Sequence, residues 1–176
     1  LNVFGSKGSG KTHLSKILEK KIDKVKILDE TEVRYKILDQ LSKIDCLIIE
    51  NYNNKIEEKL FYSVLNEAKQ LDNFVLVNSA KPLKENYFKL KDLQSRINSF
   101  VFIGIELPTD DLLKVIISKS FSEKQINLEP KVTEYIIKNV DRSYEKMIKF
   151  IKDIDELSLS SGKSININLI KKLLSQ

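Results

Sequence analysis

The sequence is poor in cysteine and histidine, and each shortage excludes a class of site. Among its 176 residues there is one cysteine, Cys46, and one histidine, His13. A single cysteine excludes an internal disulfide framework and suits a reducing, cytosolic compartment. A single histidine excludes a histidine-rich metal site. We interpret Cys46 as a small core residue, and His13 on its own as a packing or hydrogen-bonding residue rather than a catalyst.

Long hydrophobic runs and blocks of one charge are also missing. The longest apolar runs, such as residues 100–105, are far too short to span a bilayer, and no signal peptide is visible. Hydrophobic residues make up 41% and charged residues 31%, as in ordinary globular domains. The net charge of +5 is spread over lysines that alternate with 25 acidic residues. This spread favours a solvated surface over an anionic partner, and we expect no direct sequence-specific DNA binding.

Arginine is scarce beside lysine. Of the 30 basic residues, only Arg34, Arg96 and Arg142 are arginines. In such a chain an arginine marks a place where the point charge of lysine does not suffice, although chance produces the same pattern. No role can be argued for Arg34.

Strand and helix patterns alternate through the first two thirds of the chain. Strands are predicted at residues 1–4, 25–28, 46–49, 74–77 and 100–105, and helices at 11–22, 32–44, 57–71 and 90–97. The alternation predicts an α/β fold with a five-stranded parallel sheet flanked by helices, whose ligands bind at the carboxyl ends of the strands.

After Pro108 the strand signal stops and only helical patterns follow. They are predicted at residues 110–123, 131–139, 141–159 and 167–174. We therefore expect a core domain at residues 1–108 and a small all-helical lid subdomain at 109–176. Because Leu1 already reads as part of a core strand, we expect a native N-terminal segment to be missing.

Residues 5–12, Gly-Ser-Lys-Gly-Ser-Gly-Lys-Thr, match the phosphate-binding pattern G-x-x-x-x-G-K-[ST] in full, between a predicted strand and a predicted helix. Glycines let consecutive backbone N–H groups point at phosphate oxygens, and the helix N-terminus adds positive potential. Lys11 should reach the terminal phosphates and Thr12 should place its hydroxyl on Mg²⁺. The predicted nucleotide-binding residues are Ser6, Lys7, Gly8, Ser9, Gly10, Lys11 and Thr12.

Polar residues end two of the buried strands. Glu50 follows residues 47–49 and is the candidate for the magnesium side of the site, with Thr12. Asn51 stands where many ATPases carry a second carboxylate that orients water, and an amide cannot act as that base. Slow intrinsic hydrolysis is therefore expected. Asn78, after the strand at 74–77, could face the γ-phosphate. The alternatives are that Glu50 and Asn78 simply end their strands.

Two arginines have candidate roles. Arg96 lies just before the last predicted strand, where an oligomeric ATPase would project an arginine finger into a neighbour's site. Arg142 is predicted to begin a lid helix that faces the nucleotide. A helix-surface position for Arg96, and an ion pair of Arg142 with Asp141 or Glu145, are the alternatives.

These motifs, in this order, resemble the AAA+ domain of the DnaA group of replication initiators. The run at residues 8–14 looks like the extended phosphate motif of that group and adds His13 to the expected nucleotide site. Lys81-Pro82 looks like its basic-proline step, and residues 92–96, Asp-Leu-Gln-Ser-Arg, resemble its arginine-finger box. Asp141-Arg142 resembles its second sensor, where the arginine touches bound nucleotide. The resemblance covers nearly the whole chain.

Within the group the closer resemblance is to the DnaA-related Hda regulators. The chain stops after the lid helices, without room for the initiator's helix-turn-helix domain, and Asn51 resembles the regulators' acid-then-Asn pair. The resemblance implies a cytoplasmic, nucleoid-associated bacterial protein that holds ADP or ATP with Mg²⁺ and presents Arg96 to the ATP-bound DnaA initiator. It also implies sliding-clamp binding through an N-terminal motif absent here, and a homodimer as one assembly. Glu50 in place of aspartate, and Ala80 in place of an acid, depart from the pattern.

Three other functions stay open at this point. The chain could be an AAA+ fragment of the initiator itself, a general AAA+ ATPase motor or loader, or a small-molecule kinase. A kinase would need an acceptor pocket with several arginines, so the three arginines present rank it last. Brisk hydrolysis by the isolated chain would favour a motor over a regulator.

Overall fold

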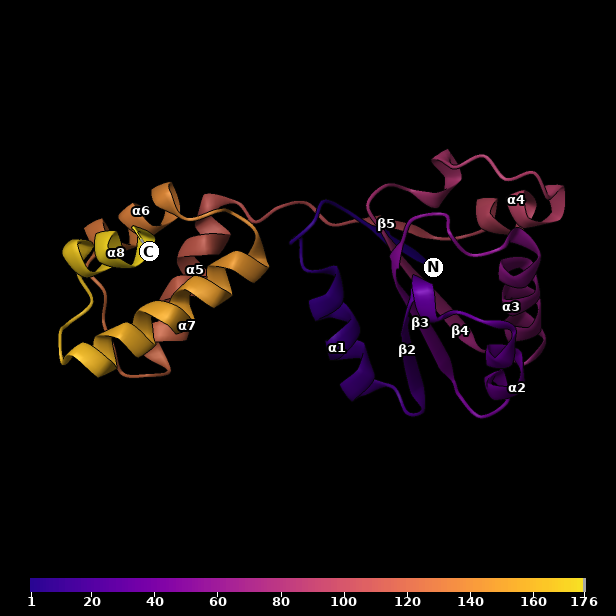
Figure 1. Cartoon of the computed structure of the whole chain (residues 1–176), viewed down its shortest axis with the longest axis horizontal. Coiled ribbons are helices and arrows are strands. Elements are labelled where there is room, and N and C mark those ends of the chain that lie inside the picture. The colour runs from indigo at the N-terminus through magenta and orange to yellow at the C-terminus, as the bar shows by residue number, and fades with distance from the viewer. Residues whose placement is uncertain (176) are drawn as a thin grey trace. The chain divides into compact units, whose positions relative to one another are not determined.

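The computed structural model describes residues 1–175 and divides the chain into two compact units, Leu1–Glu106 and Leu107–Gln176. We call them the P-loop unit and the lid unit (Figure 1). Among the helices of residues 1–175, none combines the length and apolar character that crossing a membrane requires.

The P-loop unit is built on one parallel sheet in the order β2-β3-β4-β1-β5. The strands are β1 (Asn2–Phe4), β2 (Val25–Asp29), β3 (Cys46–Tyr52), β4 (Phe74–Ser79) and β5 (Phe102–Gly104). The predicted α/β fold with a five-stranded parallel sheet is confirmed. β3 extends beyond its predicted end, while β5 is shorter than predicted.

Helices cover both faces of the sheet (Figure 1). On one face, α1 (Lys11–Lys21) packs Leu14 and Leu18 against buried residues of β1, β3 and β4. On the other face lie α2 (Leu38–Leu41), α3 (Glu58–Gln70) and α4 (Lys91–Asn98). Because β3 is covered on both sides, Cys46, Leu47, Ile48 and Ile49 are all buried, which explains the continuous apolar run.

The helix predicted at residues 32–44 is wrong over most of its length. The segment instead forms two 3₁₀ turns, η1 (Glu30–Glu32) and η2 (Tyr35–Ile37), before the short α2. Asp29 caps η1: its side chain accepts from the Thr31 amide, and the Glu32 carboxylate accepts from the Asp29 amide at 2.8 Å. This capping box closes the turn at Glu32, after which the backbone is extended.

The periodicity of apolar residues led to the wrong prediction because it reports which residues are buried and not whether the backbone is a continuous helix. Val33, Ile37 and Leu41 recur at every fourth position and are all buried in the same core cluster. Turns that repeat every three or four residues bury such a stripe as well as a helix does.

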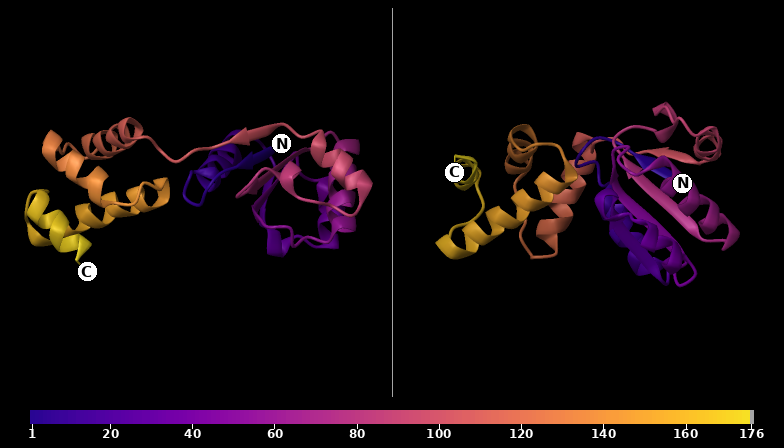
Figure 2. Two further views of the ribbon diagram at one scale, coloured as in Figure 1. Left: turned by 90° about the horizontal axis from the view of Figure 1, so that it is seen from above. Right: turned by 45° about the vertical axis from the view of Figure 1, so that its right-hand side comes forward.

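The lid unit has its own core. Its helices are α5 (Asp110–Ser122), α6 (Pro130–Asn139), α7 (Tyr144–Ser161) and α8 (Ile167–Leu174), seen from further sides in Figure 2. They bury a cluster that includes Leu113, Ile117, Ile136 and Ile154. The all-helical lid predicted from the sequence is confirmed.

The start of α7 differs from the prediction. The helix begins at Tyr144, because the Ser143 hydroxyl accepts from the Lys146 amide at 3.3 Å and so acts as the N-cap. Arg142 therefore lies in the loop before α7 and does not begin the helix.

Candidate nucleotide-binding site

The loop between β1 and α1 has a backbone conformation that requires glycine at several positions. Gly8 and Gly10 have positive φ angles of 80° and 106°. At Gly5 a Cβ atom would lie 2.2 Å from the carbonyl oxygen of Ile105, so only glycine fits there. The pattern of glycines in the sequence is thus required by this backbone.

The N-terminus of α1 is suited to an anion. Its N-cap, Gly10, offers no side-chain hydrogen bond, and the first turn carries no acidic residue. The first amides of a helix have no intrahelical acceptor, and the helix dipole makes this end positive. Among the described residues, the buried Ser9 hydroxyl also has no hydrogen-bond partner. These polar groups fit a polyphosphate.

Lys11 lies across the loop that precedes it. Its Nζ donates to the carbonyl oxygens of Gly5 at 2.7 Å and Ser6 at 2.9 Å. Partial burial lowers the pKa of Lys11, and the Glu50 carboxylate opposes this shift. The ammonium group is therefore held at the loop that would surround the phosphates.

Glu50 joins the end of β3 to the first turn of α1. Its side chain is buried, and its Oε2 accepts from the Thr12 hydroxyl at 3.1 Å. Parallel strands bring their carboxyl ends to one edge of a sheet, which is why residues 38 positions apart meet here. A hydroxyl beside a carboxylate is the oxygen-rich arrangement that Mg²⁺ prefers, so Thr12 and Glu50 fit a magnesium site.

Asn78 contacts Glu50 directly and also bonds Ser15, a residue that sequence reasoning missed. The Asn78 Nδ2 group donates to Glu50 Oε1 and to the Ser15 hydroxyl, both at 2.8 Å. Asn78 and Ser15 are buried. Ser15 carried no motif signal, and only its position one turn after Thr12 on α1 could have suggested it.

Asn51 is turned away from this cluster. It adopts φ 56° at an irregularity in the β3–β4 pairing, and its side chain is exposed. Its Nδ2 donates to Asp29 Oδ2 at 2.8 Å, at the end of β2. Hydrogen bonds from Thr31 and Asn51 lower the pKa of Asp29 to about 2. Although they are adjacent in the sequence, Glu50 and Asn51 therefore form hydrogen bonds with different parts of the P-loop unit.

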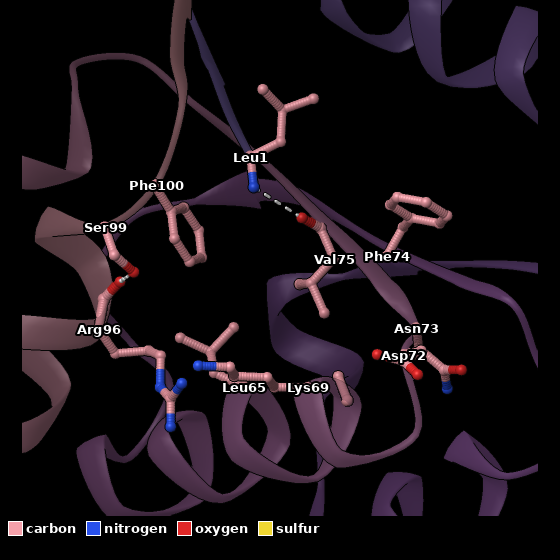
Figure 3. A pocket seen from close by; sticks show the side chains of 11 residues that line it. Leu1, Leu65, Lys69, Asp72, Asn73, Phe74, Val75, Arg96, Ser99 and Phe100 are labelled. Atoms are coloured by element: carbon pink, nitrogen blue, oxygen red, sulfur yellow. Dashed lines mark hydrogen bonds between the residues drawn. The ribbon is translucent and has the colours of Figure 1, made fainter.

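Arg96 lies near the amino-terminal ends of the strands. It is on α4, where its Nη2 donates to Asn66 Oδ1 at 2.8 Å. It lines a pocket of about 300 Å³ with Phe74 and Val75, which begin β4, and with Phe100 (Figure 3). The P-loop follows β1 at the carboxyl edge, so Arg96 and the P-loop belong to opposite ends of the strands.

Arg142 belongs to the lid unit, where its Nη1 lies 3.0 Å from Asp110 Oδ1. The predicted alternative of a pair with Asp141 or Glu145 names the wrong partner. Asp141 instead accepts from Lys146 Nζ at 2.7 Å and from the Ser143 amide at 2.8 Å, and these bonds lower its pKa.

Three other residues singled out in the sequence have simple positions. His13 is exposed in the first turn of α1. Arg34 donates to the carbonyl oxygen of Val33 at 2.9 Å. Cys46 is 2% exposed, which confirms its role in the core, and burial raises the pKa of its thiol.

Part of the chain matches a known protein family. Residues 110–174 match the family model described as "Hda, lid domain". Most of the lid unit is therefore similar to the lid domain of Hda. The resemblance to DnaA-group AAA+ domains, and to Hda within the group, is confirmed.

Solved structures of AAA+ proteins share the fold of the chain. AMPPCP-bound DnaA from Aquifex aeolicus superposes with a TM-score of 0.70 at 18% identity, over 88% of this chain and 55% of that one. Domain III of the Thermotoga maritima initiation protein DnaA gives 0.73 at 18% identity, over 99% and 82%.

The P216G mutant of RuvB from Thermotoga maritima gives a TM-score of 0.76 at 21% identity, over 99% of this chain and 61% of RuvB. This chain thus spans just over half of the Aquifex DnaA and about three fifths of RuvB. At such identities these likenesses show the fold.

Proposed function

We propose that this protein is an adenine-nucleotide-binding AAA+ regulator of replication initiation, which stimulates ATP hydrolysis by a DnaA-type initiator. In this proposal the P-loop binds ADP or ATP, which supports the protein's own conformation. Arg96 acts on the nucleotide bound to the partner. Support comes from the complete P-loop, the Hda-type lid and the AAA+ fold shared with DnaA.

The observation that carries the proposal is the separation of Arg96 from the P-loop. Arg96 lies beside the first residues of β4. At the other end of β4, the backbone carbonyl oxygen of Ser79 accepts a hydrogen bond from the Gly5 amide of the P-loop. Six residues of extended strand span about 20 Å, which no arginine side chain can bridge. An arginine at this edge is available to a neighbouring molecule's nucleotide and not to its own.

In the nucleotide site, we assign the phosphates to the amides of residues 6–13 and to Lys11. Bound Mg²⁺ would neutralise phosphate charge, with Thr12 and Glu50 as the residues that hold it. A role for Arg142 at the nucleotide is proposed only from its resemblance to the second sensor of the DnaA group. Because Asn51 is an amide and bonds Asp29, it supplies no second carboxylate to orient water, and intrinsic hydrolysis is expected to be slow.

The DnaA initiator is the proposed partner. Binding to the sliding clamp, assembly as a homodimer and a place in the bacterial cytoplasm near the nucleoid belong to the same proposal. Each rests on the resemblance to the Hda regulators.

The test is ATP turnover by a purified, ATP-loaded DnaA initiator from the same source in the presence of this protein. Arg96→Ala should abolish stimulation, since a finger arginine contributes about 10³ to 10⁵ in rate. It should leave ADP binding by the protein itself unchanged. Arg34→Ala is the matched control, because it removes an exposed arginine of the same unit. Equal stimulation by Arg96→Ala and the wild type would refute the finger.

A further inference from the structure

We propose that Asn78 and Ser15 are positioning residues for Glu50, and that Asn78 acts on nucleotide binding through the metal rather than through the γ-phosphate. This inference rests on the proposed function, in which Glu50 serves the Mg²⁺ side of the site.

The orientation of the Asn78 amide follows from the chemistry of its neighbours. An ionised carboxylate only accepts hydrogen bonds, so the group that lies 2.8 Å from Glu50 Oε1 is the NH₂ end of the amide. That nitrogen carries two hydrogens, and the second bond, to Ser15, uses the other one. Both donors of Asn78 are therefore committed within the protein.

The remaining polar atom of Asn78 cannot bind phosphate. Its Oδ1 is buried and has no partner among the described residues. An amide oxygen and a phosphate oxygen are both acceptors, so they form no hydrogen bond. Asn78 thus lacks a free donor for a γ-phosphate, although its position directly after the predicted strand at residues 74–77 suggested that role.

Ser15 ties this arrangement to the P-loop helix. Its hydroxyl accepts from Asn78 and donates to the Lys11 carbonyl oxygen at 3.3 Å, one turn back along α1. Thr12, on the same helix, bonds the other oxygen of Glu50. Glu50 is thereby held from both sides, by Thr12 directly and by Ser15 through Asn78. Losing either side frees the carboxylate to rotate away from the metal position.

The experiment measures dissociation constants of ADP and of AMPPCP, a non-hydrolysable ATP analogue, in Mg²⁺ and in EDTA. Asn78→Ala and Ser15→Ala should each weaken binding about tenfold in Mg²⁺, by the same factor for both nucleotides. In EDTA their affinities should match the wild type within about twofold. Ser15→Thr, which keeps the hydroxyl, should restore most of the magnesium-dependent affinity. Ser15→Ala is the smaller change and decides the question if Asn78→Ala does not fold.

Ser79→Ala is the matched control. Ser79 is the next residue of β4 and is also buried, but its hydroxyl bonds Asn2 and the Lys81 carbonyl oxygen instead. It should leave the magnesium dependence intact. A loss selective for AMPPCP in Asn78→Ala would make Asn78 a γ-phosphate contact, and an equal loss in EDTA would make it merely structural. Either result overturns the inference, whereas wild-type protein that binds neither nucleotide overturns the proposed function itself.

Discussion

At the scale of single residues, Lys11 is the side chain on which the proposed nucleotide binding depends most. Its ammonium group donates to two carbonyl oxygens of the loop, and partial burial lowers its pKa. A phosphate offers the same group a charged acceptor in place of neutral ones. Charge-assisted hydrogen bonds of this kind are the stronger class.

Lys11→Ala should therefore weaken ADP binding by about 10- to 100-fold, since hydrogen bonds to charged groups contribute about 1.5–3 kcal/mol. Titration calorimetry measures the change. Lys16→Ala, which removes an exposed lysine from the same helix, serves as the control and should bind like the wild type. Unchanged affinity in Lys11→Ala would rule out the loop as the phosphate site.

How far these residues could be predicted depends on what their roles require. Gly5, Gly10 and Lys11 lie in a local motif whose backbone geometry requires this sequence pattern. The position of the P-loop could therefore be predicted from the sequence. That Glu50 and Thr12 lie together was predictable, because a charge near the end of a buried strand falls at the same end of the sheet as the P-loop. The Asn78–Ser15 and Asn51–Asp29 hydrogen bonds join residues that are far apart in the sequence. No local sequence pattern predicts such contacts.

At the scale of elements, the segment after β2 shows how one cap redirects the chain. The helical stripe predicted a helix over residues 32–44, yet the Asp29 capping box closes a 3₁₀ turn first. The Asp29 carboxylate accepts from the Thr31 amide and hydroxyl and from Asn51, and these bonds lower its pKa to about 2. Asp29 therefore fixes both the turn and the end of β3.

This pKa shift predicts how the contribution of Asp29 depends on pH. A carboxylate whose pKa is depressed in the folded protein, from 3.8 to about 2, stabilises the fold above pH 4 and loses this effect as the pH falls toward 2. Asp29→Ala should lower the melting temperature of the P-loop unit at pH 7 by about 4–8 °C, as for the loss of a helix N-cap in a unit of about 100 residues.

The difference between the mutant and the wild type should shrink as the pH is lowered. Thermal melts followed by circular dichroism between pH 7 and 3 measure it. Asp23→Ala, at an exposed aspartate before β2, should show no comparable trend. A difference that stays constant down to pH 3 would mean that the ionised carboxylate is not what stabilises the turn.

At the scale of the whole molecule, the chain holds separate cores in its two units. One set of clusters lies around the sheet, and another joins α5, α6, α7 and α8. The sequence predicted this division from the end of the strand signal at Pro108. It could not predict how Arg142 is paired, because its partner Asp110 lies on another helix.

Separate cores predict separate effects of core mutations. Ile117→Ala, in the lid core, should remove about 2–5 kcal/mol from the stability of the lid unit. Val64→Ala, a buried residue of α3, should destabilise the P-loop unit in the same way. Differential scanning calorimetry should show that each mutation lowers a different transition. One transition shifted equally by both would mean that the units unfold as one.

The central claim is that the loop at residues 5–12 binds an adenine nucleotide with magnesium. Its most direct test is calorimetric titration of the purified protein with ADP in the presence of Mg²⁺. The account predicts saturable binding of one nucleotide per chain that is weakened when EDTA replaces Mg²⁺. No detectable binding of ADP or ATP under either condition would contradict it.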